Sequence, residues 1–85
     1  MRLVFDPAAL EDLQFWVRTD RRKSERILKL LEAVLRDPFE GPGKPERLRF
    51  GRTGQWSRRI DQEHRLVYQV DDDDLIILSC RYHYE

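Results

Sequence analysis

The sequence lacks the features that secreted and membrane-spanning chains need. It has one cysteine in 85 residues, so it cannot form an internal disulfide, which fits a reducing compartment. Its longest aliphatic run, Leu75–Leu78, is far too short to cross a bilayer. The N-terminus does not resemble a secretory signal, because Asp6 interrupts a short apolar run. We therefore expect a cytoplasmic protein that does not associate with membranes.

The net charge of the chain is zero, because its 16 basic and 16 acidic side chains cancel. Their distribution is uneven, however, with a balance of +4 over residues 41–70 and −4 over residues 71–85. Six of the seven cations in the basic stretch are arginines, whose planar guanidinium groups match phosphate. Composition alone favours an ordinary solvated surface. Whether these arginines bind phosphate depends on where the fold places them.

A chain of this length with 40% hydrophobic residues is expected to form a single domain, residues 1–85, around one core. Asp6-Pro7 has the pattern of a helix start, with Asp6 as the cap. The first helix should pack through one apolar stripe: Leu10, Leu13, Trp16 and Val17. A second helix is predicted from about Arg21 to Arg36, where Asp37-Pro38 ends it. Its stripe is Ile27, Leu28, Leu31, Val34 and Leu35.

The rest of the chain has strand character, after a short strand at residues 3–5. Residues 39–45 form a proline-rich loop, which should be stiff and should bring Glu46 to a fixed position. Further strands are predicted at residues 47–50, 55–60, 65–70 and 75–84, with turns between them. The predicted fold is α+β: an N-terminal strand, then a helical hairpin packed on one face of a mostly antiparallel sheet.

Alternation along these strands predicts where the basic side chains gather. Arg65 should lie on the face opposite Leu66 and Tyr68, and Arg59 on the face away from Ile60. In the last strand, Ser79, Arg81 and His83 share one face. Because consecutive hairpin strands pair, the face without helices should collect four basic groups and, from the stiff loop, a carboxylate. They are Arg59, Arg65, Arg81, His83 and Glu46.

A carboxylate, an imidazole and several guanidinium groups around one pocket can cleave RNA without a metal ion or other cofactor. The carboxylate takes the proton of a ribose 2′-hydroxyl, the imidazolium protonates the departing 5′-oxygen, and the guanidinium groups stabilise the phosphate. Each residue also has a structural explanation. Glu46 alone is more often a salt-bridge partner, His83 a surface histidine and His64 a turn residue. Zinc binding is disfavoured by the His and Cys spacing, and Asp71–Asp74 is more typical of a solvated turn.

Four blocks of sequence resemble the YoeB group of RelE/ParE-type bacterial toxins, in order, spacing and total length. They are residues 39–46, Trp56–Ile60, Glu63–Tyr68 and Cys80–Tyr84. The resemblance implies a ribosome-dependent mRNA endoribonuclease of a type II toxin–antitoxin system, which cuts mRNA in the ribosomal A site and inhibits translation. It also implies a YefM-like antitoxin and the ribosome with bound mRNA as partners, and it leaves a homodimer open.

The resemblance implies that Glu46 is the general base and His83 the general acid. It implies that Arg65 stabilises the phosphate. Supporting substrate-binding positions fall on Arg49, Arg59, Glu63, Arg81 and Tyr84. Arg49 stands where the family pattern has lysine, which keeps the charge but changes its shape. Two other interpretations stay open. One is a ParE-like toxin that binds DNA gyrase and cuts nothing, and the other is a module whose only partner is the antitoxin.

Overall fold

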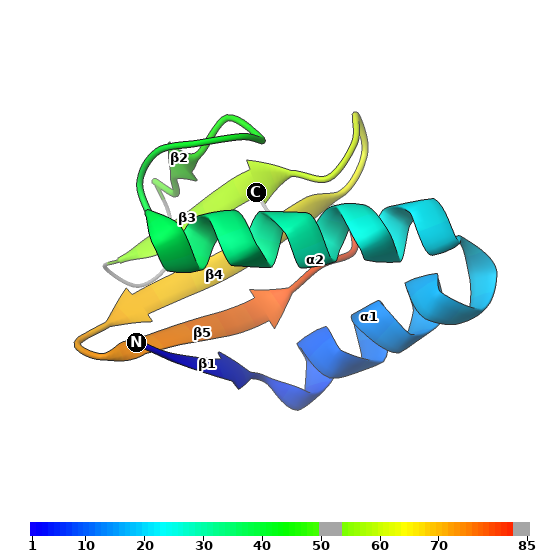
Figure 1. The fold of residues 1–85 in the computed structure, drawn as a ribbon, viewed down its shortest axis with the longest axis horizontal. Coiled ribbons are helices and arrows are strands. Elements are labelled where there is room, and N and C mark those ends of the chain that lie inside the picture. Colours follow the sequence, from blue (N-terminus) through cyan, green and yellow to red (C-terminus); the bar gives the residue numbers. More distant parts are fainter. Residues whose placement is uncertain (50–53, 83–85) are drawn as a thin grey trace.

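The computed structural model describes residues 1–49 and 54–82, which form two helices on one face of a five-stranded sheet (Figure 1). The strands are β1 (Arg2–Phe5), β2 (Glu46–Arg47), β3 (Gln55–Arg59), β4 (Arg65–Asp71) and β5 (Asp74–Ser79). The helices are α1 (Pro7–Thr19) and α2 (Arg21–Arg36). The sheet order is β1-β5-β4-β3-β2, with β1 parallel to β5 and all other neighbours antiparallel. The α+β prediction is confirmed.

Both helices begin at an aspartate cap, which is the predicted Asp6 for α1 and Asp20 for α2. Asp6 accepts a hydrogen bond from the backbone N–H of Ala8, and Pro7 occupies the first helical position. Asp20 separates the helices: its own N–H bonds to the last turn of α1, while its carboxylate accepts the N–H of Arg22 at the start of α2. One aspartate therefore ends one helix and begins the next.

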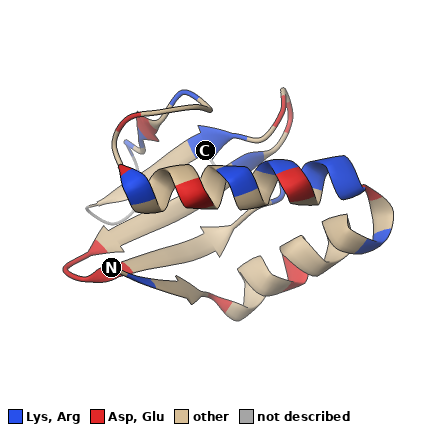
Figure 2. Cartoon of the chain, viewed as in Figure 1, with Lys and Arg blue, Asp and Glu red and all other residues tan. Residues whose placement is uncertain are grey.

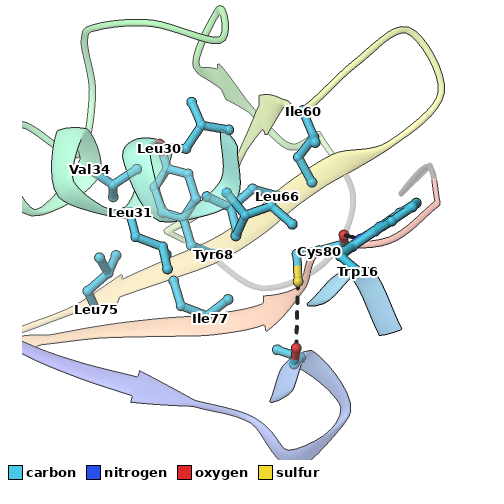
Figure 3. Close-up of a cluster of buried hydrophobic side chains, with 12 residues drawn as sticks. Trp16, Leu30, Leu31, Val34, Ile60, Leu66, Tyr68, Leu75, Ile77 and Cys80 are labelled. Atoms are coloured by element: carbon cyan, nitrogen blue, oxygen red, sulfur yellow. Dashed lines mark hydrogen bonds between the residues drawn. The ribbon is translucent and has the colours of Figure 1, made fainter. Parts of the chain in front are cut away.

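The core lies between α2 and the middle of the sheet (Figure 3). Leu30 and Leu31 of α2 pack on Leu66 and Tyr68 of β4, and Trp16 is the largest buried residue of α1. The predicted stripes were wrong in part. Leu10, Val17, Leu28 and Leu35 are exposed, whereas Ala9 and Leu30 are fully buried. Each helix contacts the sheet along a band narrower than its apolar stripe, so side chains at the margin of the stripe remain in solvent.

The predicted strands at residues 55–60 and 65–70 are confirmed to within one residue at the end of each, as β3 and β4. The strand predicted at residues 47–50 is instead the short β2, which begins at Glu46; position 50 and most of the following turn lie outside the described residues. The strand predicted at residues 3–5 is β1, whose Leu3 pairs with Leu75 of β5.

The final strand ends earlier than predicted. β5 stops at Ser79, and its pairing with β4 shifts between Tyr68↔Ile77 and Val67↔Ser79, which leaves Leu78 as an extra residue. A bulge of this kind displaces the alternation by one residue. The predicted alternation from residue 75 to 84 is therefore wrong beyond Ile77 in the described part of the chain; His83 and Tyr84 lie outside it.

Within the described part of the chain, neither helix combines the length and the apolar character that a membrane span requires.

Candidate functional site

The face of the sheet opposite the helices carries the candidate site, and we call it the second face. Strand register defines it: Glu46 pairs with Ser57, Ser57 with Val67, and Arg59 with Arg65. Paired residues point to the same side of a sheet. Val67 is buried, yet it is not part of the core cluster under the helices. The structure thus brings Glu46, Arg59 and Arg65 to one face. Alternation predicted this for the two arginines, whereas Glu46 was expected to arrive from the stiff loop and is instead the first residue of β2.

Glu46 and Arg65 meet on this face. Oε2 of Glu46 lies 3.9 Å from Nη1 of Arg65, which is an ionic contact too long for a hydrogen bond. The Arg65 side chain is 19% exposed and that of Glu46 is 57% exposed. No group among residues 1–49 and 54–82 accepts a hydrogen bond from Nη1, although this atom is buried. A buried donor without a partner is costly, so an anionic oxygen brought to this position would be bound favourably.

A buried arginine holds the loop that leads to Glu46. Arg58 is 0% exposed, and its guanidinium group points to the helix side of β3. It donates to three loop carbonyl oxygens: those of Asp37 (2.6 Å), Glu40 (2.9 Å) and Pro42 (3.2 Å). Its Nε donates to the hydroxyl of Tyr68, 3.2 Å away, which in turn donates to the carbonyl of Pro38.

These contacts give the proline-rich loop a fixed path. Burial raises the pKa of the Tyr68 phenol, although Arg58 beside it acts in the opposite direction, so the hydroxyl remains a donor at neutral pH. The backbone N–H of Arg59 donates to the carbonyl of Gly43 at 2.7 Å, which continues the β2–β3 pairing toward the loop. This network is consistent with the prediction that the loop brings Glu46 to a fixed position. The residue at its centre is Arg58, for which sequence reasoning predicted no role.

The remaining predicted residues are more scattered. Arg59 is exposed beside Arg65, where the charged ends of β3 and β4 lie next to each other (Figure 2). Arg49 is exposed two residues after β2. Glu63 lies in the β3–β4 turn, with its carboxylate 3.8 Å from Nε2 of His64. His83 and Tyr84 are outside the described residues.

Arg81 is not where alternation placed it. Because β5 ends at Ser79, Arg81 follows the end of the strand, and its guanidinium carbon lies 3.5 Å from the ring centroid of Phe15 in α1. It also lies 4.6 Å from the ring centroid of Tyr82. Stacking of a guanidinium group on two aromatic rings anchors this segment to α1. The expectation that Arg81 joins Arg65 on the second face is therefore wrong.

The single cysteine and the acidic turn contribute no reactive group to this face. Burial raises the pKa of the Cys80 thiol to about 12, with a further contribution from Asp12. Its Sγ lies 3.6 Å from the carbonyl oxygen of Ala9 in α1 (Figure 3). Asp71–Asp74 forms the β4–β5 turn, far along the sheet from the ends of β3 and β4 that carry Arg59 and Arg65 (Figure 2). Among the described residues, no three His, Cys, Asp or Glu side chains are grouped as metal ligands.

Solved structures show which class of protein has this helical hairpin on a mixed five-stranded sheet: YoeB/ParE-type toxins. Solved structures place the chain in this class. It superimposes on a YoeB/ParE toxin from Agrobacterium tumefaciens with a TM-score of 0.94 and 45% identity, covering 99% of this chain and 100% of that one.

The family follows from the sequence comparisons. Residues 5–84 match the model of the YoeB-like toxin of bacterial type II toxin–antitoxin systems. Toxin RelK of Mycobacterium tuberculosis is 54% identical over 80 residues, which is 94% of each chain. Toxin YoeB of Escherichia coli is 49% identical over 84 residues, covering 99% of this chain and 100% of the relative. The chain belongs to the YoeB-like toxin family.

Two further solved structures, both from Staphylococcus aureus, are described as assemblies. One is a YoeB dimer, with a TM-score of 0.91 and 45% identity over 99% of this chain and 98% of that one. The other is a heterotetrameric YoeB–YefM toxin–antitoxin complex, with a TM-score of 0.87 and 45% identity over the same shares.

Proposed function

We propose that this toxin is a ribosome-dependent endoribonuclease that cleaves mRNA in the ribosomal A site and thereby inhibits translation. The observation that carries the proposal is the 3.9 Å contact between Glu46 and an Arg65 guanidinium nitrogen that has no hydrogen-bond acceptor among the described residues. A carboxylate beside an anion-binding group is the pair that phosphodiester cleavage at a ribose requires.

The proposed reaction is an internal transesterification. Glu46 takes the proton of the 2′-hydroxyl, and the 2′-oxygen attacks the adjacent phosphorus. The bond to the 5′-oxygen breaks, and His83 supplies the proton that this leaving group needs. Arg65 binds the phosphate oxygens as their charge increases, and Arg59, paired with Arg65 across the two strands, adds positive charge on the same face. These steps need no metal ion and no cofactor. DNA, which lacks the 2′-hydroxyl, is not a substrate.

Supporting substrate contacts are proposed for Arg49, Glu63, Arg81 and Tyr84. Arg49 is exposed and can reach an RNA backbone without desolvation of other groups. Arg81 already stacks on Phe15, so we assign it a contact at the margin of the site and not beside Arg65. The net charge of zero gives the free toxin little general attraction to RNA, and the ribosome is proposed to position the message.

The test uses purified toxin, programmed ribosomes and mapping of mRNA ends. We expect cleavage within the A-site codon, and a 2′-deoxy nucleotide at the mapped position should block it. Glu46→Gln should lower the rate by about 10²–10⁴-fold, the usual contribution of one general base. Glu32→Gln, at an exposed position of α2, is the matched control and should cleave like the parent.

Two outcomes would overturn the proposal. Cleavage by Glu46→Gln at the parental rate would remove the assigned base. Growth arrest by the parent with intact mRNA would instead favour a toxin that acts by binding a protein such as DNA gyrase.

We propose a YefM-like antitoxin as the inhibitory partner, because the S. aureus neighbour of the same family is described as a complex with YefM. We also propose that the free toxin forms a homodimer, on the basis of the S. aureus YoeB dimer. Sedimentation of the toxin alone and after mixing with a YefM-like protein tests both. A monomer at all concentrations would refute the homodimer, and failure to sediment together with the YefM-like protein would refute the partner. Localisation in the cytoplasm, where the ribosomes are, is part of the same proposal.

A further inference from the structure

The short segment after β5, residues 80–82, is attached to the body of the protein from both ends. At its start, the backbone N–H of Cys80 donates to Asp12 of α1 at 3.0 Å, and the carbonyl of Cys80 accepts from the indole Nε1 of Trp16 at 2.8 Å. At its end, the backbone N–H of Arg65 donates to the carbonyl of Tyr82 at 3.1 Å. The segment therefore follows one defined path between α1 and β4.

His64 makes the remaining contact. Nδ1 of its imidazole accepts a hydrogen bond of 2.7 Å from the backbone N–H of Tyr82. An acceptor nitrogen carries no proton, so this contact requires the neutral imidazole with its proton on Nε2. In an ordinary strand pair the N–H of Tyr82 would donate to a backbone carbonyl, and here it donates to the His64 side chain instead. His64 and the next residue, Arg65, thus hold both backbone polar groups of Tyr82.

The imidazole itself is held in place by its surroundings. His64 is 9% exposed, and its ring packs edge-on against the indole of Trp16, with 4.8 Å between ring centroids. Its ring centroid lies 5.7 Å from that of Tyr82. The backbone N–H of His64 donates to the carboxylate of Asp61 at 2.6 Å, which fixes the turn that presents the ring. His64 is therefore a buried residue with fixed contacts, and the expectation of an ordinary turn residue is wrong.

The backbone conformation of Tyr82 depends on these hydrogen bonds. Its φ of 68° lies in the left-handed region, which disfavours residues with a side chain. A residue persists in this conformation when its surroundings determine it, and here both backbone hydrogen bonds of Tyr82 come from residues 64 and 65. Loss of the bond to His64 would allow the chain at Tyr82 to relax to an extended conformation, which would change the direction in which the backbone leaves Tyr82.

We propose that His64 is a positioning residue for the cleavage reaction. Its Nδ1 fixes the backbone of Tyr82 relative to Arg65, and so fixes the point from which the chain continues to His83. This inference rests on the proposed function, in which Arg65 binds the phosphate and His83 donates the proton. His64 does not touch the RNA. A misplacement of about 1 Å in a catalytic group can cost about 10²-fold in rate, which is the size of effect expected here.

Two substitutions separate the acceptor from the ring. His64→Phe keeps an aromatic ring against Trp16 but replaces Nδ1 with a C–H group. His64→Asn loses the ring but keeps an acceptor oxygen near the position of Nδ1. We expect His64→Phe to lower kcat by about 10²-fold with little change in KM, and His64→Asn to recover at least tenfold of that loss. The backbone amide of Tyr82 should exchange its proton rapidly in His64→Phe and slowly in His64→Asn.

A backbone variant makes the test independent of side-chain packing. Ligation of a synthetic peptide at Cys80 allows the amide between Arg81 and Tyr82 to be replaced by an ester, which deletes the N–H that donates to His64 and changes no side chain. We expect the same loss in kcat as for His64→Phe. This variant decides the question even if His64→Phe does not fold.

The proposal is overturned if the ester variant retains the parental kcat, or if His64→Asn, when folded, is as inactive as His64→Phe. Failure of the parent to cleave mRNA on ribosomes would refute the proposed function. In that case exchange at the Tyr82 amide still shows whether His64 holds this segment, so the two failures are distinguishable.

Discussion

Substitution of two adjacent arginines should have different effects: replacement of Arg58 should reduce stability, and replacement of Arg59 should reduce mRNA cleavage. They follow each other in β3 and therefore point to opposite faces of the sheet. Arg58 is fully buried, whereas Arg59 is exposed beside Arg65. Replacement of each in turn by methionine, which has similar length and no charge, should give opposite results.

The magnitude for Arg58→Met follows from its contacts. The substitution leaves three carbonyl oxygens, those of residues 37, 40 and 42, without their donors. A buried acceptor without a partner costs about 1–3 kcal/mol. These carbonyls belong to exposed residues that water can reach after a small movement, so the lower value applies to each. We expect a loss of about 3 kcal/mol, equivalent to a fall in Tm of roughly 12–24 °C for a chain of this size.

Urea unfolding monitored by tryptophan fluorescence measures the effect, with Arg59→Met as the matched control. Arg59→Met should stay within about 0.5 kcal/mol of the parent in unfolding free energy, because it is a surface substitution. It should nevertheless impair mRNA cleavage, because Arg59 lies on the second face. Tyr68→Phe, which removes the hydroxyl between Arg58 and Pro38, should cost about 1–2 kcal/mol and should not add fully to Arg58→Met. A stability of Arg58→Met within 1 kcal/mol of the parent would show that the loop does not depend on the guanidinium group.

Three further predictions follow from individual contacts. Burial raises the pKa of Asp61, but hydrogen bonds from the His64 and Glu63 backbones and from Lys23 together hold it below 3.8. Asp61 should therefore stabilise the fold above about pH 4 and less as pH falls below that value, and Asp61→Asn should reduce this dependence in urea titrations at pH 6 and pH 3. With its pKa near 12, the Cys80 thiol should react with iodoacetamide at pH 8 about 10³-fold more slowly than a free cysteine thiol; equal rates would contradict its burial. Gly43→Ala should cost about 1–3 kcal/mol in thermal unfolding, because φ is +88° and the new Cβ would lie 3.2 Å from the carbonyl oxygen of Arg59; an unchanged Tm would show that the loop adapts.

The parts of the fold that sequence predicted are those with local chemical signals. Asp6 with Pro7, and Asp37 with Pro38, mark helix boundaries through contacts within a few residues. The shared face of Arg59 and Arg65 was also predictable, because β3 and β4 are regular and strict alternation assigns their faces. Glu46 was expected from the stiff loop, and it contacts Arg65 from β2.

Sequence failed where long-range contacts or backbone irregularity decide the outcome. The extra residue in β5 at Leu78 has no distinctive side chain, so nothing in the pattern indicated that Arg81 would leave the strand. The partners of Arg58 are backbone carbonyls, which have no sequence signature. Alternation was used only for its neighbour Arg59, and no role was predicted for Arg58. The role of His64 depends on a chain segment that returns from residue 82. A histidine directly before the candidate arginine was the available signal, but its partner could not be named.

The pairing of β1 with β5 has a consequence for the order in which the protein can form. The first strand to be synthesised, Arg2–Phe5, has the last strand as its neighbour in the sheet, with Arg2 opposite Asp74. During translation this strand must wait until β5, Asp74–Ser79, has been made. A nascent chain can therefore form its helices early but cannot close its sheet until β5 emerges, and any truncation before residue 74 leaves β1 without its neighbour.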